Sequence, residues 1–250
     1  MKAIVAIGGG EIGRPGTKIE THSIDKEIIR LAKKQHPRLL FLPTASGDSA
    51  SYYEVVKNYF SKKLGCKTDV LYLSTPALST QEIRKKILSA DIIYVGGGNT
   101  LTMMRTWRKT GTDTILKEAY EKGIILSGLS AGAICWFSSG NSDSLRFVNN
   151  KESFSFIKVK GLSLAKGVLC PHYDFEKGRK ESLKKMLRSS GGIGIAIDNC
   201  AALEICDDTY RVLSSKKGAR VYRTFWKDGK YIEQALPILK IFRPINELYN

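Results

Sequence analysis

The stretch from Gly123 to Trp136 constrains this chain more than any other. An apolar run at residues 124–126 predicts a buried strand. Gly-Leu-Ser-Ala-Gly follows at residues 128–132, and the apolar residues 133–136 suit a packed helix. A strand, a sharp turn that carries a serine and a helix are the context of a nucleophile elbow. The alternative is a tight turn in which Ser130 only caps the helix.

Strands alternate with helices through the first half of the chain. Apolar runs predict strands at residues 2–7, 39–42, 70–73 and 92–95, with amphipathic helices between them. This alternation predicts an α/β fold with a doubly wound, mostly parallel sheet flanked by helices. After about residue 140 the pattern becomes more antiparallel, with strands expected at residues 153–159, 168–170, 193–197, 201–205 and 211–213. No linker or repeat divides the chain, so we expect residues 1–250 to form a single α/β hydrolytic domain.

The net charge of +16 comes from 40 Lys and Arg residues against 24 Asp and Glu residues. The basic residues are scattered over the predicted helices, which favours a basic surface over a nucleic-acid site. No apolar run approaches the roughly 18 residues that span a membrane, so no membrane partner is expected. Five cysteines without a Cys-x-x-Cys pair indicate a reduced, cytoplasmic protein.

A serine nucleophile needs a base, and the chain has three histidines. His22 precedes the first predicted helix, and His36 lies at a polar helix end. His172 follows an apolar strand and Pro171, so it is expected at the strand ends where such sheets bind ligands. His172 is therefore the best partner for Ser130. The segment around it offers too few ligands for a zinc site, so neither a metal nor a cofactor is expected.

A third residue should orient the imidazole of His172. Asp198 is the first choice, because it ends an apolar strand at the same sheet edge. Asp143, Asp174 and Glu204 compete, and the sequence does not rank them well. Asp174 is expected to serve the local turn, and Glu204 fits an exposed strand position.

Two glycine runs end predicted strands, at residues 8–10 and 96–98. Gly-Gly-Gly-Asn-Thr at residues 96–100 lacks the Lys-Ser/Thr of a phosphate-binding Walker loop. A glycine loop beside a nucleophile can instead donate N–H groups to an oxyanion. A tight turn is the alternative for both runs, and it is the preferred interpretation for residues 8–10.

The motifs at residues 96–100, 128–133 and 171–174, together with Pro-Thr-Ala-Ser at residues 43–46, occur in a specific order and spacing. They resemble the aspartyl dipeptidase (dipeptidase E) and cyanophycinase family of serine peptidases over roughly residues 1–215. The resemblance implies a fold similar to class I glutamine amidotransferases, with serine in place of their cysteine. It also implies Ser130 as nucleophile, His172 as base, and the N–H groups of Gly98 and Ala131 as the oxyanion hole.

Some positions depart from the family pattern. Members carry a catalytic glutamate after a late strand, where this chain has Asn199, and a second family proposal places an aspartate near Asp143. Aspartyl dipeptidases hold the substrate carboxylate with an arginine downstream of the histidine, and Arg179 is the nearest candidate. Asn99 is also expected to bind substrate.

The sequence thus predicts a serine peptidase that hydrolyses small peptides, like a dipeptidase, through an acyl-enzyme on Ser130. The alternative is a member of the same fold that is inactive or hydrolyses other substrates. The expected partner is a small peptide, and a homodimer is left open.

Overall fold

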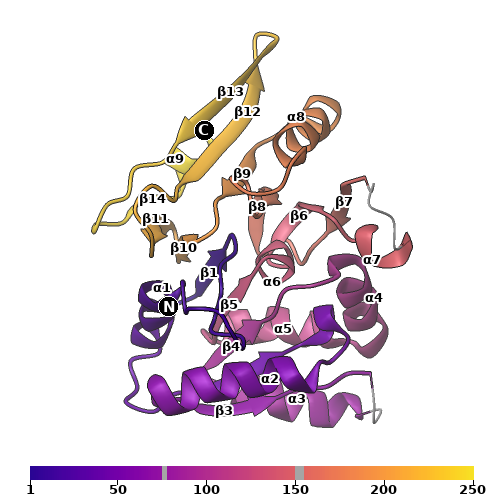
Figure 1. Ribbon diagram of the computed structural model, residues 1–250, viewed down its shortest axis with the longest axis vertical. Helices are drawn as coiled ribbons and strands as arrows, with labels where there is room; N and C mark the ends of the chain where they lie inside the picture. The colour runs from indigo at the N-terminus through magenta and orange to yellow at the C-terminus, as the bar shows by residue number, and fades with distance from the viewer. Residues whose placement is uncertain (75–77, 150–154) are drawn as a thin grey trace.

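The computed structural model describes residues 1–74, 78–149 and 155–250 (Figure 1). In this part of the chain a first sheet has the strand order β14-β11-β10-β1-β5-β4-β2-β3. Its strands are β1 (Ala3–Ile7), β2 (Arg38–Leu42), β3 (Lys67–Val70), β4 (Ile92–Val95), β5 (Ile125–Leu129), β10 (Ala201–Cys206), β11 (Thr209–Ser214) and β14 (Arg243–Pro244). The five strands from β1 to β3 in this order are parallel, and β10, β11 and β14 extend the sheet antiparallel.

A second sheet has the order β13-β12-β9-β8-β6-β7. Its strands are β6 (Phe137–Ser142), β7 (Ile157–Lys160), β8 (Ala165–Cys170), β9 (Gly194–Ile197), β12 (Val221–Lys227) and β13 (Lys230–Ala235). The expected α/β class, with a more antiparallel C-terminal part, is confirmed. The difference is that the strands divide between two mixed sheets. Of the strand expected at residues 153–159, residues 153 and 154 lie outside the described residues.

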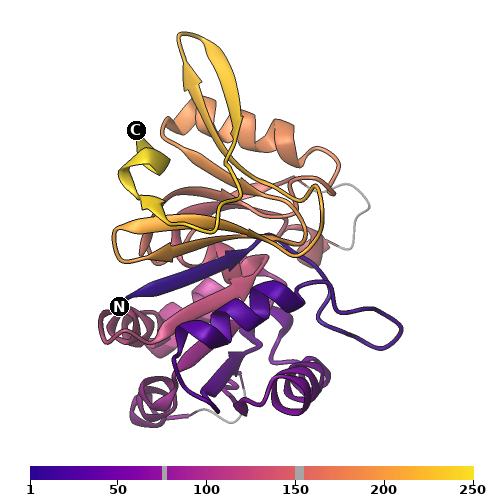
Figure 2. The same cartoon turned by 90° about the vertical axis from the view of Figure 1, so that its left-hand side faces the viewer.

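Helices cover the outer faces and the space between the sheets (Figures 1 and 2). One face of the first sheet packs against α1 (His22–Leu31), α2 (Ala50–Lys57) and the π-helical turn η2 (Asn58–Lys63). The other face packs against α3 (Thr80–Ser89), α4 (Thr100–Thr110), α5 (Thr112–Glu121) and α6 (Ala131–Ile134). The second sheet carries α8 (Arg179–Ser190), and short pieces complete the described chain: η1 (Thr44–Ser46), α7 (Arg146–Asn149) and α9 (Asn246–Tyr249).

The alternation of side chains along β1 explains the two layers. Ala3, Val5 and Ile7 enter the cluster with α1 and α2, whereas Ile4 and Ala6 enter the cluster that contains α6. Among the described residues, no helix has the length and apolar character needed to cross a membrane.

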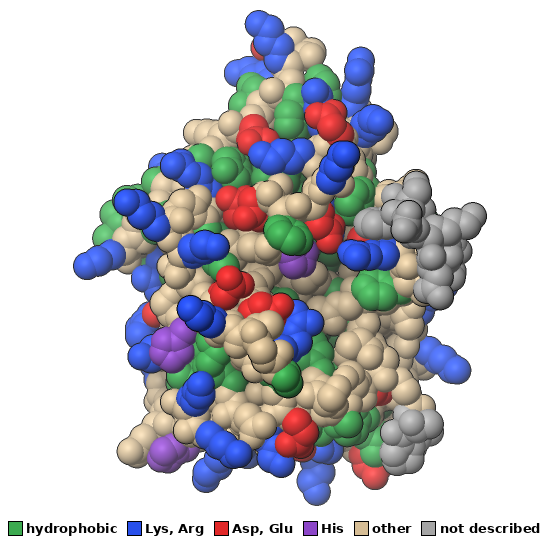
Figure 3. All heavy atoms as spheres, in the orientation of Figure 1, with side chains coloured by type: hydrophobic (Ala, Val, Ile, Leu, Met, Phe, Trp, Pro, Cys, Tyr) green, Lys and Arg blue, Asp and Glu red, His purple; other side chains and the backbone are tan. Residues whose placement is uncertain are grey.

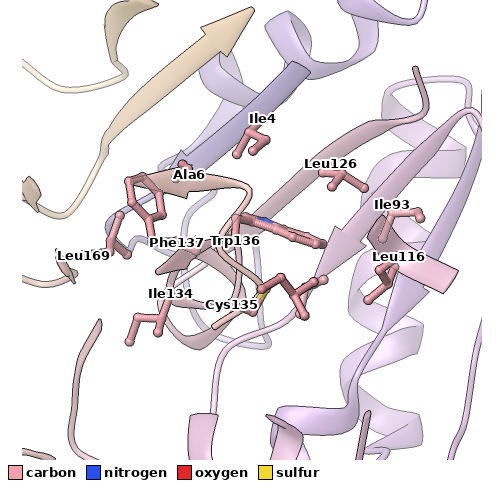
Figure 4. Packing of buried hydrophobic residues seen from close by; sticks show 14 of the residues in the cluster. Ile4, Ala6, Ile93, Leu116, Leu126, Ile134, Cys135, Trp136, Phe137 and Leu169 are labelled. Atoms are coloured by element: carbon pink, nitrogen blue, oxygen red, sulfur yellow. The ribbon is translucent and has the colours of Figure 1, made fainter. Parts of the chain in front are cut away.

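The main core lies around α6, where the two sheets meet (Figure 4). Residues 134–137 at the end of α6 and the start of β6 are almost fully buried. They pack together with Ile4 and Ala6 of the first sheet and Leu169 of the second. Because close-packed side chains surround α6, the turn that enters it has little freedom to move.

Candidate active site

Ser130 lies in the turn between β5 and α6, as the sequence predicts. Its backbone has φ 56° and ψ −114°, a conformation that residues with a side chain rarely adopt. The N–H of Ser130 donates to the carbonyl of Ile7 at 3.0 Å, and its own carbonyl accepts from Ala133 and Ile134. The side chain makes no capping hydrogen bond to the helix. The capping alternative is therefore wrong, and the turn is a strained elbow.

The two glycines of the elbow are required because backbones approach closely there. A Cβ on Gly132 would lie 2.1 Å from the carbonyl oxygen of Val95 in β4. A Cβ on Gly128 would lie 2.5 Å from the carbonyl oxygen of Gly132 and 2.8 Å from that of Val95. Any larger residue would push α6 away from β4, so these glycines fix where Ser130 stands.

His172 lies just beyond the end of β8 and is held on three sides. Its N–H donates to the carbonyl of Gly8 at 3.1 Å, and its Nδ1 forms a 2.7 Å hydrogen bond with Oδ1 of Asn199. A Cβ on Gly9 would come within 2.4 Å of the imidazole and 2.1 Å of Asn199 Oδ1. Gly9 is therefore required for the close approach of His172 and Asn199, a role beyond the simple turn preferred for residues 8–10.

The structure corrects the expected third residue. Asp198 does not bond to His172: its Oδ2 accepts from the N–H of Arg220 at 3.0 Å, beside the start of β12. Burial raises the pKa of Asp198 to about 6. The amide of Asn199, one residue later, takes the place expected for Asp198.

The other carboxylates expected to compete also have different partners. Glu204 is fully buried and pairs with Arg211 on β11, so it is not an exposed strand residue. Asp174 accepts from the N–H of Asn199 at 2.8 Å and so supports the turn, as expected. Asp143 lies near enough to His172 to favour its protonated form without a hydrogen bond between them.

Burial lowers the pKa of His172 below its usual value, and the hydrogen bond that its ring donates to Asn199 opposes this effect. Oδ1 of Asn199 can only accept, so Nδ1 carries the proton and donates it to this bond. The other ring nitrogen, Nε2, is then unprotonated. An imidazole in this state can take a proton from a neighbouring hydroxyl.

The glycine loop after β4 lies against Ser130. A Cβ on Gly97 would be 3.4 Å from Cβ of Ser130. Gly98 has φ 139°, and a Cβ there would lie 2.2 Å from the carbonyl oxygen of Ala45, so this position demands glycine. Among the described residues, the N–H of Gly98 has no hydrogen-bond acceptor. Ala131 is the first residue of α6, where an N–H has no acceptor within the helix.

The two residues expected to bind substrate are engaged elsewhere. Asn99 caps α4: its Oδ1 accepts from the N–H of Thr102 at 3.0 Å, and its Nδ2 donates to the carbonyl of Ser144 at 3.4 Å. Arg179 is 1% exposed. Its Nη1 donates to the carbonyl of Asn141 at 2.8 Å, and its Nη2 pairs with Glu176. Neither side chain lines the cavity described below, because both serve to hold loops in place.

Ser130 and His172 line one cavity of about 1210 Å³, which also reaches Gly98, Asp143 and Glu176. Figure 3 shows the molecule hollowed at mid-height, with both acidic and basic side chains around the hollow. Within residues 1–74, 78–149 and 155–250, no group of three or more His, Cys, Asp and Glu side chains is placed to hold a metal ion.

Sequence reasoning missed Asn199, Gly9 and Glu176. Asn199 had a signal, since it stands where the family carries its catalytic glutamate. Glu176 lies three residues before Arg179 in the sequence, a spacing that pairs opposite charges on one helical turn. Gly9 had no signal of its own, because only the approach of His172 and Asn199 from distant segments makes it necessary.

The model of Peptidase family S51 matches residues 4–213. "Uncharacterized peptidase YgaJ" of Bacillus subtilis (strain 168) is 36% identical over 240 residues, covering 95% of this chain and 98% of the relative. A crystal structure of a peptidase from an acI-B1 Actinobacterium has a TM-score of 0.69 at 22% identity, covering 98% of this chain and 97% of that one. A putative peptidase E protein from Listeria monocytogenes EGD-e has a TM-score of 0.62 at 23% identity, covering 86% of this chain and 98% of that one. The last two likenesses show the fold alone. With its elbow serine at residue 130 and most of its length matched, the chain belongs to peptidase family S51 and is a serine-type peptidase.

Proposed function

We propose that the protein hydrolyses small peptides through an acyl-enzyme on Ser130, with His172 as the general base. One observation carries this proposal: Ser130 and a His172 whose Nδ1 is held by Asn199 line the same cavity. A strained serine and an oriented imidazole are the two groups that acyl transfer requires.

In the proposed reaction, Oγ of Ser130 attacks the carbonyl carbon of the scissile bond and gives its proton to Nε2 of His172. The N–H groups of Gly98 and Ala131 stabilise the negative charge on the carbonyl oxygen. The imidazolium then gives the proton to the leaving nitrogen, the C–N bond breaks, and the acyl group stays on Ser130. Water, activated by the same imidazole, releases the acid and restores the hydroxyl of Ser130.

Asn199 is proposed as the positioning residue of this site. An amide orients the imidazole and selects its tautomer, as a carboxylate does in a Ser-His-Asp triad, but adds no negative charge. His172 therefore gains less support for its protonated form than it would beside a carboxylate. Because burial already lowers its pKa, His172 stays neutral, and able to act as a base, around neutral pH.

The size of the cavity supports a small substrate. At about 1210 Å³ it is somewhat larger than the usual small-molecule site, which is about 300–1,000 Å³, and so has room for a short peptide. That space suits a short peptide better than an extended protein segment. A dipeptidase-like activity fits this geometry.

The test combines a serine-directed label with turnover of a set of dipeptides and tripeptides. A fluorophosphonate should label the parent protein on Ser130, and Ser130→Ala should abolish the labelling and lower kcat by about 10⁴-fold or more. Ser189→Ala, which removes an exposed serine of α8, is the matched control and should change neither.

The alternatives give different outcomes. A protein that is labelled at Ser130 and hydrolyses esters but no peptide would be a hydrolase of another class. A protein that is not labelled and cleaves nothing would be an inactive member of the fold. Peptide cleavage by Ser130→Ala at the parent rate would refute the acyl-enzyme.

A further inference from the structure

The charge of the cavity is opposite in sign to the charge of the chain. The chain carries +16, yet six acidic side chains line the cavity against four basic ones. The acids are Glu11, Glu20, Asp143, Asp174, Glu176 and Asp198. The bases are Arg14, Arg146, Lys216 and Lys217. Arg14 pairs with Glu11, and Glu176 pairs with Arg146 and with the buried Arg179, so these charges largely cancel. The balance stays acidic, because the lining acids that remain are Glu20, Asp143, Asp174 and Asp198 against Lys216 and Lys217.

In the described part of the chain, Asp143 is the one of these six acids whose carboxylate has neither an ion pair nor a hydrogen bond to another residue, whereas Glu20, Asp174 and Asp198 each accept from a backbone N–H. It lies just after β6 and lines the same cavity as Ser130 and His172. Its carboxylate forms no hydrogen bond or ion pair with another side chain in the part of the chain that the structure describes. Burial raises its pKa, and Arg179 opposes this effect from a distance. A partly buried carboxylate in this state would be stabilised by a cation from the substrate.

Arg179 is not available to an acidic substrate. Its guanidinium is buried, donates to the carbonyl of Asn141 and pairs with Glu176. The central carbon of the guanidinium, Cζ, lies 4.6 Å from the centre of the Phe156 ring. Glu176, rather than Arg179, lines the cavity. The charge of Glu176 is already balanced by Arg179 and Arg146, so a substrate carboxylate placed here would meet the unpaired carboxylate of Asp143, and like charges in a partly desolvated site repel.

Two aromatic side chains also line the cavity. Phe147 of α7 and Phe175 of the turn after His172 line the same cavity and are 54% and 77% exposed. Exposed aromatic side chains next to an acid provide apolar contact for a substrate and a face that attracts cations.

We propose that Asp143 selects substrates by binding a cationic nitrogen, so that the enzyme favours peptides with a free amino terminus or a basic first side chain over peptides that begin with an acidic residue. This inference rests on the proposed function and assigns Asp143 to specificity. It differs from the orienting role that the resemblance suggested for an acid near this position.

The experiment compares Asp143→Asn with the parent on four substrates that share one leaving group. They begin with free alanine, N-acetyl-alanine, N-acetyl-lysine and free aspartate. The free alanine substrate carries an α-ammonium, and the N-acetyl-lysine substrate carries only a side-chain ammonium. The N-acetyl-alanine substrate has no cation. Asp228→Asn removes the same charge at the exposed turn between β12 and β13 and is the matched control.

In the parent, the free alanine or the N-acetyl-lysine substrate, or both, should have a kcat/KM at least ten-fold above the N-acetyl-alanine and aspartate substrates. Asp143→Asn should raise KM for the cationic substrates about ten-fold or more, with kcat within about two-fold, and leave the N-acetyl-alanine substrate unchanged. Asp228→Asn should match the parent throughout.

Three results would overturn the inference. Equal loss of kcat on all four substrates would make Asp143 a partner of His172, and unchanged KM values would give it no role in recognition. A parent preference for the aspartate substrate would also count against it. Fluorophosphonate labelling of Ser130 separates this failure from failure of the proposed function, because labelling needs no substrate cation.

Discussion

Replacing Asn199 with aspartate exchanges a neutral acceptor for a charged one of the same size. Oδ1 of Asn199 lies 2.7 Å from Nδ1 of His172, which places the two charge centres about 4 Å apart. At an effective dielectric constant of about 20, such a pair interacts by about 4 kcal/mol. One pKa unit corresponds to about 1.4 kcal/mol, so the upper limit is a rise of about three units in the pKa of His172.

Water in the open cavity screens this interaction, so we expect a rise of about one to two units, within the usual effect of an adjacent opposite charge. The sign follows from the role of His172. Its neutral form is the base, so a higher pKa means less base at a given pH. The acid limb of the kcat/KM profile of Asn199→Asp should therefore move up by about one to two pH units, while the values on the alkaline plateau stay within a few-fold of the parent.

The assay is kcat/KM for one neutral dipeptide between about pH 5 and 9, with the pH stability of each variant confirmed by circular dichroism. Asn246→Asp adds the same charge at the exposed start of α9 and should leave the limb in place. Asn199→Ala should lower kcat by roughly 10- to 150-fold, because a hydrogen bond to a charged group contributes about 1.5–3 kcal/mol. An acid limb that stays fixed or moves down in Asn199→Asp would refute the assignment of Asn199 as the partner of His172.

Four further predictions follow from the geometry. Gly9→Ala should lower kcat/KM by about 10²-fold or more with a circular dichroism spectrum like that of the parent, because the new Cβ would displace His172 and Asn199; parent-like turnover would contradict this. Arg179→Gln should lower the free energy of unfolding by about 3 kcal/mol in urea titrations, since it removes the buried partner of Glu176 and the hydrogen bond to the carbonyl of Asn141, and should create no change in preference for acidic substrates. Asp198→Asn should keep kcat within about ten-fold of the parent. Folding raises the pKa of Asp198 from 3.8 to about 6, so the protonated carboxyl stabilises the fold fully below about pH 3.8, and this contribution is lost as the pH rises through about 6. Asp198→Asn should therefore be more stable than the parent at about pH 7 but not at about pH 3.5. Ser130→Gly should be inactive yet more stable than Ser130→Ala by about 1 kcal/mol, because glycine adopts the backbone angles of the elbow without strain. Equal stability of the two variants would mean that the backbone of the elbow is not strained.

The sequence alone predicted the parts of this protein that depend on neighbours along the chain. Apolar runs and helical periodicity gave β1, β2, β4 and β5 nearly in place, because side-chain spacing reports directly on local geometry. The strand, the glycines and the serine around Ser130 predicted the elbow, since a tight turn between two buried elements leaves few residue types possible. His172 was selected because it follows an apolar strand and a proline, and it does line the cavity with Ser130.

Only the tertiary structure decided between residues one position apart. Asp198 and Asn199 both follow β9, but the chain turns through residues 199–200 before β10, so the two side chains meet different partners. Asp198 therefore turns to the N–H of Arg220, and Asn199 meets His172. A sequence gives the position of a residue along a strand with an uncertainty of a residue or two, and that uncertainty is enough to exchange the two roles.

The packing of distant segments also decided what Gly9 and Arg179 do. Gly9 is required because residues 172 and 199 meet above it, and Arg179 is withdrawn from the cavity because Asn141 and Glu176 hold its guanidinium. The division of the strands into two sheets has the same origin. Pairing between strands far apart in sequence depends on how whole faces pack, and no local pattern in the chain records it.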